Sequence, residues 1–275
     1  MYRKEFGNGI YITTDEDKEM IKEHVLCYKD LFYYGNYLLD NCFEEVIADY
    51  KLTIYSNLYK ILELLDTLKV MTENGLIESG FIVLRSLVEC SVQLSFILSD
   101  SNSIKKRAIV FQMYDIKRTS LDEINFYTQM KQVSSYIPYI TLFKIKKPFD
   151  NWYSYSEERR VTIKELFEKS QLISLYDSLY RPLCLETHVA LHMESNIVPD
   201  ANNKFNFKPF RMFENHILLI HSILKIIMPT YTKLIENFGD EVVKKEWVEY
   251  KNKTINYLES NDLIIDLFTN TTKWF

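Results

Sequence analysis

Turn-forming residues are scarce in this chain. Its 275 residues include only six glycines and six prolines, whereas an average protein devotes roughly 12% of its sequence to these two residue types. β-Sandwiches, barrels and glycine-looped nucleotide folds need many tight turns, so this scarcity disfavours them. The sequence therefore predicts an all-α protein, a helical bundle of about seven to eight helices.

Composition and charge narrow the function classes. Hydrophobic residues make up 47% of the chain and charged residues 26%, which is typical of a folded globular protein and excludes a disordered one. The formal net charge is −5, so the chain has no global positive field to hold a long nucleic acid by counterion release. A small local site for RNA is compatible with this charge.

Cysteine usage and the apolar segments favour a cytoplasmic location. Four widely spaced cysteines are present: Cys27, Cys42, Cys90 and Cys184. They form no CxxC pair, so neither a zinc ribbon nor a redox motif is indicated, and reduced, mostly buried thiols are expected. The N-terminus lacks the apolar stretch of a signal peptide. The most apolar run, 217–228, is shorter than the roughly 20 residues that cross a bilayer, so we expect a buried helix and no membrane association.

The strongest helical pattern lies over residues 43–99. Apolar residues recur there at spacings of three and four, which predicts an amphipathic helix. Asn74 and Gly75 should end it, because both tolerate the left-handed conformation of a helix C-terminus. We therefore expect a long antiparallel helical hairpin over 43–99 that packs against a helix over 172–194.

Weaker patterns predict the other helices. Their ranges are about 15–40, 104–134, 156–170, 172–194, 209–237 and 240–267. The basic residues Lys105, Lys106 and Arg107 are expected on the solvated side of the helix over 104–134.

Two irregular segments interrupt the helical pattern, near 136–157 and 196–207. The first contains two prolines and several closely spaced aromatic residues, and loops of this length are often functional. A short extension, 1–14, precedes the first helix. Since no internal repeat or low-complexity tract divides the chain, we expect a single helical domain over 1–275.

Three charged residues stand out within the second helix of the hairpin. Glu78, Arg85 and Glu89 are spaced seven and four residues apart, which places them on one helix face. Their neighbours are nearly all apolar, and an unpaired buried charge is very costly, so these side chains must be paired or line a polar cavity. Arg85 and Glu89 are therefore candidates for a catalytic centre or for an ion pair that fixes the register of two helices.

A second group of candidate catalytic or metal-binding residues lies about a hundred residues later in the chain. Arg181 and His188 are seven residues apart and would share a face of an unbroken helix, although Pro182 can kink it. His188 and His192 are one turn apart, a spacing that can bind a metal. Two histidines are a weak signal by themselves, so we expect neither a metal nor a cofactor.

Two short motifs lie about a hundred residues apart in the chain. The first is Gly75–Cys90, which contains the sequence Leu-Arg-Ser-Leu-Val-Glu, and the second contains Tyr176, Leu179, Tyr180 and His188. Over about residues 45–235 the pattern resembles a bacterial all-helical family of unknown function. Members of that family are met near mobile and defence-associated genes. The resemblance implies a defence or toxin-type role and a partner protein of a defence system, but no established reaction.

The pair Arg181 and His188 also resembles the motif of the HEPN superfamily, an Arg followed by a His after a few residues. Many HEPN domains are metal-independent RNases with a site across a dimer, so this resemblance implies an endoribonuclease that forms a homodimer and acts on RNA. In such a reaction a His moves a proton while an Arg stabilises the charge on the phosphate. The expected catalytic residues are His188 with Arg181, or His188 with Arg85 and its neighbour Glu89.

The alternative is a non-enzymatic helical sensor or protein-interaction module. In that interpretation Arg85, Glu89 and His188 form a structural polar core, and the irregular segments recognise a partner. Its support is the surplus of aromatic residues in those segments, such as Trp152 and Tyr155, which would suit a partner surface or a stacked base. The other interpretation of these aromatic residues is that they cover the core. A small-molecule pocket between helices is a third interpretation.

Overall fold

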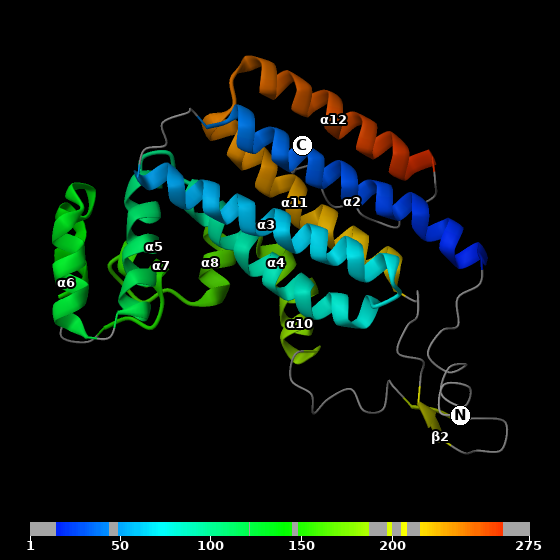
Figure 1. Cartoon of the computed structure of the whole chain (residues 1–275), viewed down its shortest axis with the longest axis horizontal. Helices are drawn as coiled ribbons and strands as arrows, with labels where there is room; N and C mark the ends of the chain where they lie inside the picture. The colour runs from blue at the N-terminus through cyan, green and yellow to red at the C-terminus, as the bar shows by residue number, and fades with distance from the viewer. Residues whose placement is uncertain are drawn as a thin grey trace, which may run out of the picture.

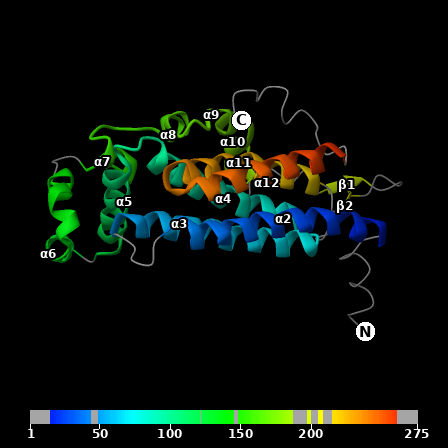
Figure 2. The ribbon, with the colours of Figure 1, turned by 90° about the horizontal axis from the view of Figure 1, so that it is seen from above.

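The longest helices lie side by side along one axis of the molecule (Figures 1 and 2). In this computed structural model they are α2 (Asp15–Asn41), α3 (Asp49–Glu73), α4 (Ile77–Leu98), α11 (His216–Phe238) and α12 (Glu241–Ser260). The structure describes residues 15–43, 49–120, 122–144, 148–186, 197–199, 205–207 and 215–260. The predicted all-α fold class is confirmed. The expected extension, 1–14, lies outside the described residues.

A tight turn joins α3 to α4. The backbone N–H of Leu76 donates to the carbonyl of Met71 (2.8 Å), and that of Gly75 donates to Thr72 (3.0 Å), which is the Schellman pattern of a helix C-terminus. Gly75 has a φ of 69°, a conformation that glycine adopts at no steric cost. The chain therefore reverses where the sequence predicted, and α4 packs back against α3.

The two most apolar long helices, α4 and α11, form the centre of the bundle. Thirteen of the 22 residues of α4 and 15 of the 23 residues of α11 are buried. Both helices are long and apolar enough to cross a membrane by length and composition, which by itself is weak evidence for a span. In the most apolar 18-residue window of each helix, 56% of α4 and 72% of α11 is buried inside the protein. Packing in the core therefore accounts for the apolar composition of the two helices.

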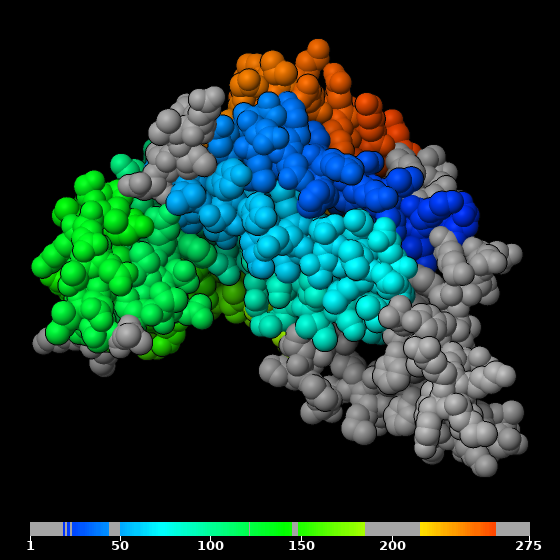
Figure 3. Space-filling view, viewed as in Figure 1, coloured from blue at the N-terminus to red at the C-terminus, as the bar shows by residue number. Residues whose placement is uncertain are grey.

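A lobe built from residues 104–156 lies at one end of the bundle, in green at the left of Figure 3. Its elements are α5 (Ile104–Thr119), α6 (Glu123–Gln132), the 3₁₀ helix η1 (Ser134–Phe143) and α7 (Trp152–Ser156). The lobe has its own apolar cluster, in which the rings of Phe143 and Tyr155 stack with centroids 4.5 Å apart. Tyr155 is fully buried and Trp152 is 5% exposed. The expectation that these two aromatic residues suit a partner surface is therefore wrong.

The boundaries within this lobe differ from the sequence expectation of one helix over 104–134 and an irregular segment over 136–157. The helix is divided because Asp122 caps a new one, its side chain accepting a backbone hydrogen bond of 2.7 Å from the first turn of α6. Helix η1 and helix α7 occupy much of the segment expected to be irregular, and Pro138 lies inside η1. Asn151 caps α7 in the same way as Asp122 caps α6.

Short elements connect the lobe to α11. They are α8 (Ile163–Lys169), α9 (Ile173–Leu175), the π-helical turn η2 (Tyr176–Tyr180), α10 (Arg181–Glu186), β1 (Ile197–Pro199) and β2 (Phe205–Phe207). The strands pair antiparallel, with Ile197 opposite Phe207. The polar loop expected over 196–207 therefore contains a short β-ladder, and the single helix expected over 172–194 begins as three successive helical pieces.

Candidate functional site

Arg85 and Glu89 of α4 meet Tyr180 of η2 at the surface of the bundle. The guanidinium Nη2 of Arg85 lies 2.9 Å from Oε1 of Glu89, and the two side chains are 34% and 32% exposed. The hydroxyl of Tyr180 donates to the same Oε1 at 3.0 Å. Arg85 also lies 6.0 Å from the centroid of the Tyr180 ring, within the range of a cation–π contact. The structure therefore brings together Arg85 and Glu89, as their spacing predicted, and adds Tyr180.

A π-helical turn positions Tyr180. Residues Tyr176–Tyr180 form one wide turn immediately before α10, and such turns occur frequently at functional sites. A proline inside a helix crowds the carbonyl four residues earlier, so the wide turn provides room for the ring of Pro182. The rings of Tyr176 and Tyr180 stack with centroids 5.9 Å apart, which orients the Tyr180 hydroxyl towards α4.

The electrostatics of this contact favour a fixed arrangement. A hydrogen bond with Cys184 of α10 raises the pKa of Arg85; burial opposes the shift, and the charge of Glu89 adds to it. Burial and the charge of Glu89 raise the pKa of the Tyr180 phenol above its ordinary value. At neutral pH Arg85 therefore keeps its charge and Tyr180 keeps its proton. These two groups hold α4 against the η2–α10 segment and are not suited to proton transfer.

Arg181 takes a different partner from Arg85. Its side chain is 67% exposed and forms an ion pair of 3.2 Å with Asp177 on the preceding turn. His188 and His192 lie outside the described residues, so the expected pairing of His188 with either arginine has no geometry here. Across the described ranges, no group of three or more His, Cys, Asp or Glu side chains is placed to hold a metal ion.

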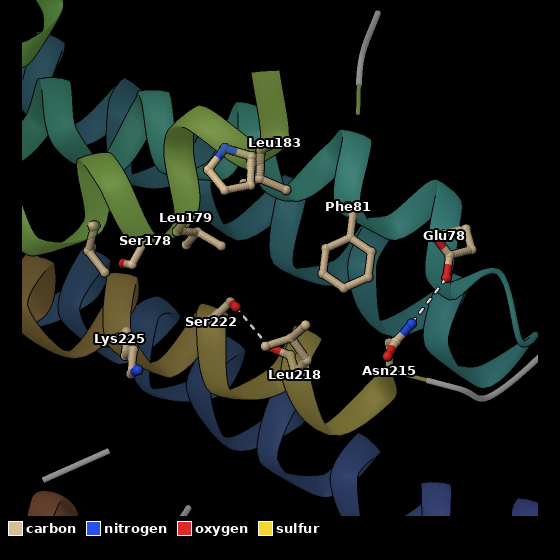
Figure 4. Close-up of a pocket in the computed structure, with 11 residues that line it drawn as sticks. Glu78, Phe81, Ser178, Leu179, Leu183, Asn215, Leu218, Ser222 and Lys225 are labelled. Atoms are coloured by element: carbon tan, nitrogen blue, oxygen red, sulfur yellow. Dashed lines mark hydrogen bonds between the residues drawn. The ribbon is translucent and has the colours of Figure 1, made fainter. Parts of the chain in front are cut away.

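An open groove lies between α4, the α9–α10 segment and α11, with a volume of about 280 Å³. Figure 4 shows Phe81 of α4, Leu179 and Leu183 of η2 and α10, and Leu218 of α11 around it. Phe81 and Leu183 are buried, whereas Leu218 is 56% exposed. The groove therefore exposes apolar surface to solvent. One of its walls belongs to the η2–α10 segment, which the hydrogen bond of Tyr180 joins to α4.

Glu78 belongs to this groove rather than to the Arg85 contact. Its carboxylate accepts a hydrogen bond of 3.4 Å from the side-chain amide of Asn215, just before α11 (Figure 4). The sequence placed Glu78 on one face with Arg85 and Glu89, but the structure gives it a separate partner. Two groove residues on α11, Leu218 and Lys225, were missed, because their helix has the apolar pattern of a buried segment and only the tertiary packing exposes one side of it.

A second ionic network, which lies away from the groove, was also missed. The sequence placed Arg107 on a solvated face, yet its side chain is only 7% exposed and lies 3.0 Å from Glu157. Its guanidinium also donates to the carbonyl of Phe96 (2.7 Å) and the hydroxyl of Ser99 (2.8 Å). Glu157 accepts in addition from Lys169 (2.5 Å). Arg107 is buried because Glu157, which is 50 residues away in the sequence, compensates its charge.

Comparisons with known proteins give one family match. A family model described as a family of unknown function, DUF5677, matches residues 52–205. This range contains Arg85, Glu89 and Tyr180, and α11 lies after it. The match supports the resemblance to a family of unknown function, and it says nothing of defence genes or of the HEPN superfamily. No curated protein and no solved structure matches the chain.

Proposed function

The chain belongs to the family of unknown function DUF5677, and from this premise we propose that it acts as a non-enzymatic helical sensor that binds a small ligand. The observation that carries the proposal is the groove between α4, the α9–α10 segment and α11. Ligand sites are typically concave and mostly apolar with a few polar groups. This groove has that composition, with a volume near the lower end of the usual range.

The polar contact beside the groove supports binding over catalysis. Tyr180 and Glu89 join α4 to the η2–α10 segment, so they hold the wall in a fixed position for a ligand. In the part of the chain that the structure describes, the ionisable residues lining the groove are Glu78 and Lys225. Glu78 is hydrogen-bonded to Asn215, so these residues do not form an acid–base pair facing a common reacting atom.

Binding of a neutral solvatochromic dye tests this function. Leu218→Arg puts a charge into the apolar groove, and we expect it to weaken a saturable dye signal by about tenfold or more, because an unpaired charge is costly in an apolar site. Leu26→Arg is the matched control, since Leu26 lies on α2 and is 54% exposed, against 56% for Leu218. No saturable binding, or equal effects of the two variants, would refute a binding groove.

Metal-independent RNA cleavage is a second candidate function. The observation in its favour is the exposure of Arg181, which is 67%, so its guanidinium is accessible to a substrate as large as RNA. The test is incubation of the wild type with total RNA in the presence of a chelator, beside Arg181→Ala and His188→Ala. Arg160→Ala serves as the control, because Arg160 is also exposed. Cleavage that is lost in Arg181→Ala and His188→Ala but retained in Arg160→Ala supports this function. Intact RNA after incubation with the folded wild type contradicts it.

We also propose that the protein forms a homodimer, lies in the cytoplasm and binds a partner protein of a defence system, as the sequence led us to expect. Size-exclusion chromatography with light scattering tests the homodimer, for which we expect a mass of twice 32.9 kDa. A mass of one chain at all accessible concentrations would argue against a site shared between two copies.

A further inference from the structure

The middle of the groove offers a ligand no unused hydroxyl donor. The hydroxyl of Ser222 donates to the carbonyl of Leu218 (2.8 Å), and that of Ser178 donates to Ser174 (2.6 Å), so both lining serines bond to their own helical segment. The remaining surface there comes from Phe81, leucines and a proline. A ligand segment that crosses this part gains most from burying hydrocarbon.

The two ends of the groove carry charges of opposite sign. At one end the Glu78 carboxylate and the Asn215 amide are bonded to each other. At the other end Lys225 is exposed, and nothing in the described parts of the chain forms an ion pair or a side-chain hydrogen bond with it. Figure 4 shows Lys225, Ser222 and Leu218 in order along α11, with Asn215 just before the start of the helix. Within the described residues, the groove therefore runs from the unpaired ammonium of Lys225, over apolar surface, to the carboxylate of Glu78, which accepts one hydrogen bond from the Asn215 amide.

Helix geometry sets the length of this path. Asn215 and Lys225 are ten residues apart, which corresponds to about 15 Å along a helix axis. A fully extended hydrocarbon advances about 1.3 Å per carbon–carbon bond, slightly more per bond than the peptide backbone, so a linear chain of about twelve carbons, roughly 14 Å long, spans the groove. The volume of about 280 Å³ suits one such narrow ligand better than a bulky one.

We propose that the groove binds a single linear acyl anion of about twelve carbons, with its carboxylate at Lys225 and its methyl end towards Glu78 and Asn215. This inference rests on the proposed sensor function and names its ligand class. The opposite orientation is disfavoured because it places the ligand carboxylate beside the carboxylate of Glu78. The contacts expected are one exposed ion pair and a buried chain.

Calorimetric titration with dodecanoate below its micellar concentration tests the proposal on the full-length chain. Dodecyltrimethylammonium is the probe of equal chain length and opposite charge. We expect the wild type to prefer dodecanoate and Lys225→Glu to bind dodecanoate about three- to tenfold more weakly, the size of a lost exposed ion pair plus repulsion. Lys245→Glu is the control, because it makes the same charge change at an exposed position of α12. The control should bind dodecanoate as the wild type does.

The outcomes separate the ligand class from the sensor function. If the neutral dye binds in the groove but the wild type takes both amphiphiles equally, or Lys225→Glu behaves as Lys245→Glu, the acyl-anion proposal is wrong and the binding groove stands. If neither dye nor dodecanoate binds, both are wrong. Binding to vesicles of anionic phospholipid without binding of monomeric dodecanoate would also overturn the proposal, because it would assign the site to a membrane surface instead of one free acyl anion.

Discussion

Replacing Gly35 by alanine should destabilise the protein, although alanine is the better helix former. Gly35 lies in α2 where that helix meets α3 and α11. A Cβ atom at this position would approach both a methyl of Leu62 and the hydroxyl of Tyr231 to less than 3.0 Å. Tyr231 cannot swing away easily, because it is fully buried and its hydroxyl donates to the carbonyl of Leu31 at 3.0 Å.

The magnitude follows from three opposing contributions. Overpacking a core site costs about 1–3 kcal/mol, and losing the Tyr231 hydrogen bond costs about 1 kcal/mol more. Alanine in place of glycine in a helix returns about 1 kcal/mol. The expected result is a net loss of about 1–3 kcal/mol in the free energy of unfolding.

Urea denaturation followed by circular dichroism measures this loss. Gly80→Ala is the matched control in α4, since the nearest atom to its Cβ would be the end of the Leu219 side chain, at 3.1 Å, and Leu68 would lie at an ordinary contact distance of 3.7 Å. The control should change stability by less than about 1 kcal/mol, because its smaller packing conflict is offset by helix propensity. A Gly35→Ala protein as stable as the wild type, or as stable as Gly80→Ala, would refute the close three-helix contact described here.

Two further predictions concern polar contacts. Glu157→Gln should cost about 3 kcal/mol at neutral pH, because it removes the carboxylate that faces Arg107. Burial raises the pKa of Glu157, but the hydrogen bond from Lys169 and the charge of Arg107 outweigh it and hold this pKa below its ordinary value. Its contribution is therefore present above the unfolded-state pKa and is lost as the pH falls through the folded-state pKa, so the stability difference between the two proteins should shrink as the pH falls below about 4; a difference that does not change with pH contradicts this. Tyr180→Phe should lose about 1 kcal/mol in the same assay, since it removes the hydrogen bond to Glu89, and an unchanged midpoint would mean that this bond contributes nothing.

The local part of the fold could be predicted from the sequence. Asn74 and Gly75 mark the end of α3 because glycine there takes a left-handed conformation, and this signal depends on adjacent residues alone. The pairing of Arg85 with Glu89 was predicted in the same way, because residues four apart on a helix face each other. Such features need only the helix period.

The remaining features depend on residues far apart in the chain. Arg107 was predicted on a solvated face, because nothing near it in sequence indicates that Glu157 will reach it. Tyr180 reaches Glu89 through a π-helical turn, which has no sequence signal as clear as the Gly75 turn. The groove likewise arises only when α11 lies beside the α9–α10 segment, so the exposed side of Leu218 could not be read from its apolar helix.

Leucine-methyl NMR during a titration with dodecanoate tests whether the groove on one side of α11 binds a linear acyl anion. We expect saturable shifts for the groove residues Leu179, Leu183 and Leu218, with no shift for Leu26 and Leu52, which are 54% and 49% exposed on other helices. Shifts that are spread over all exposed leucines, or no saturable shift at Leu218, would contradict it.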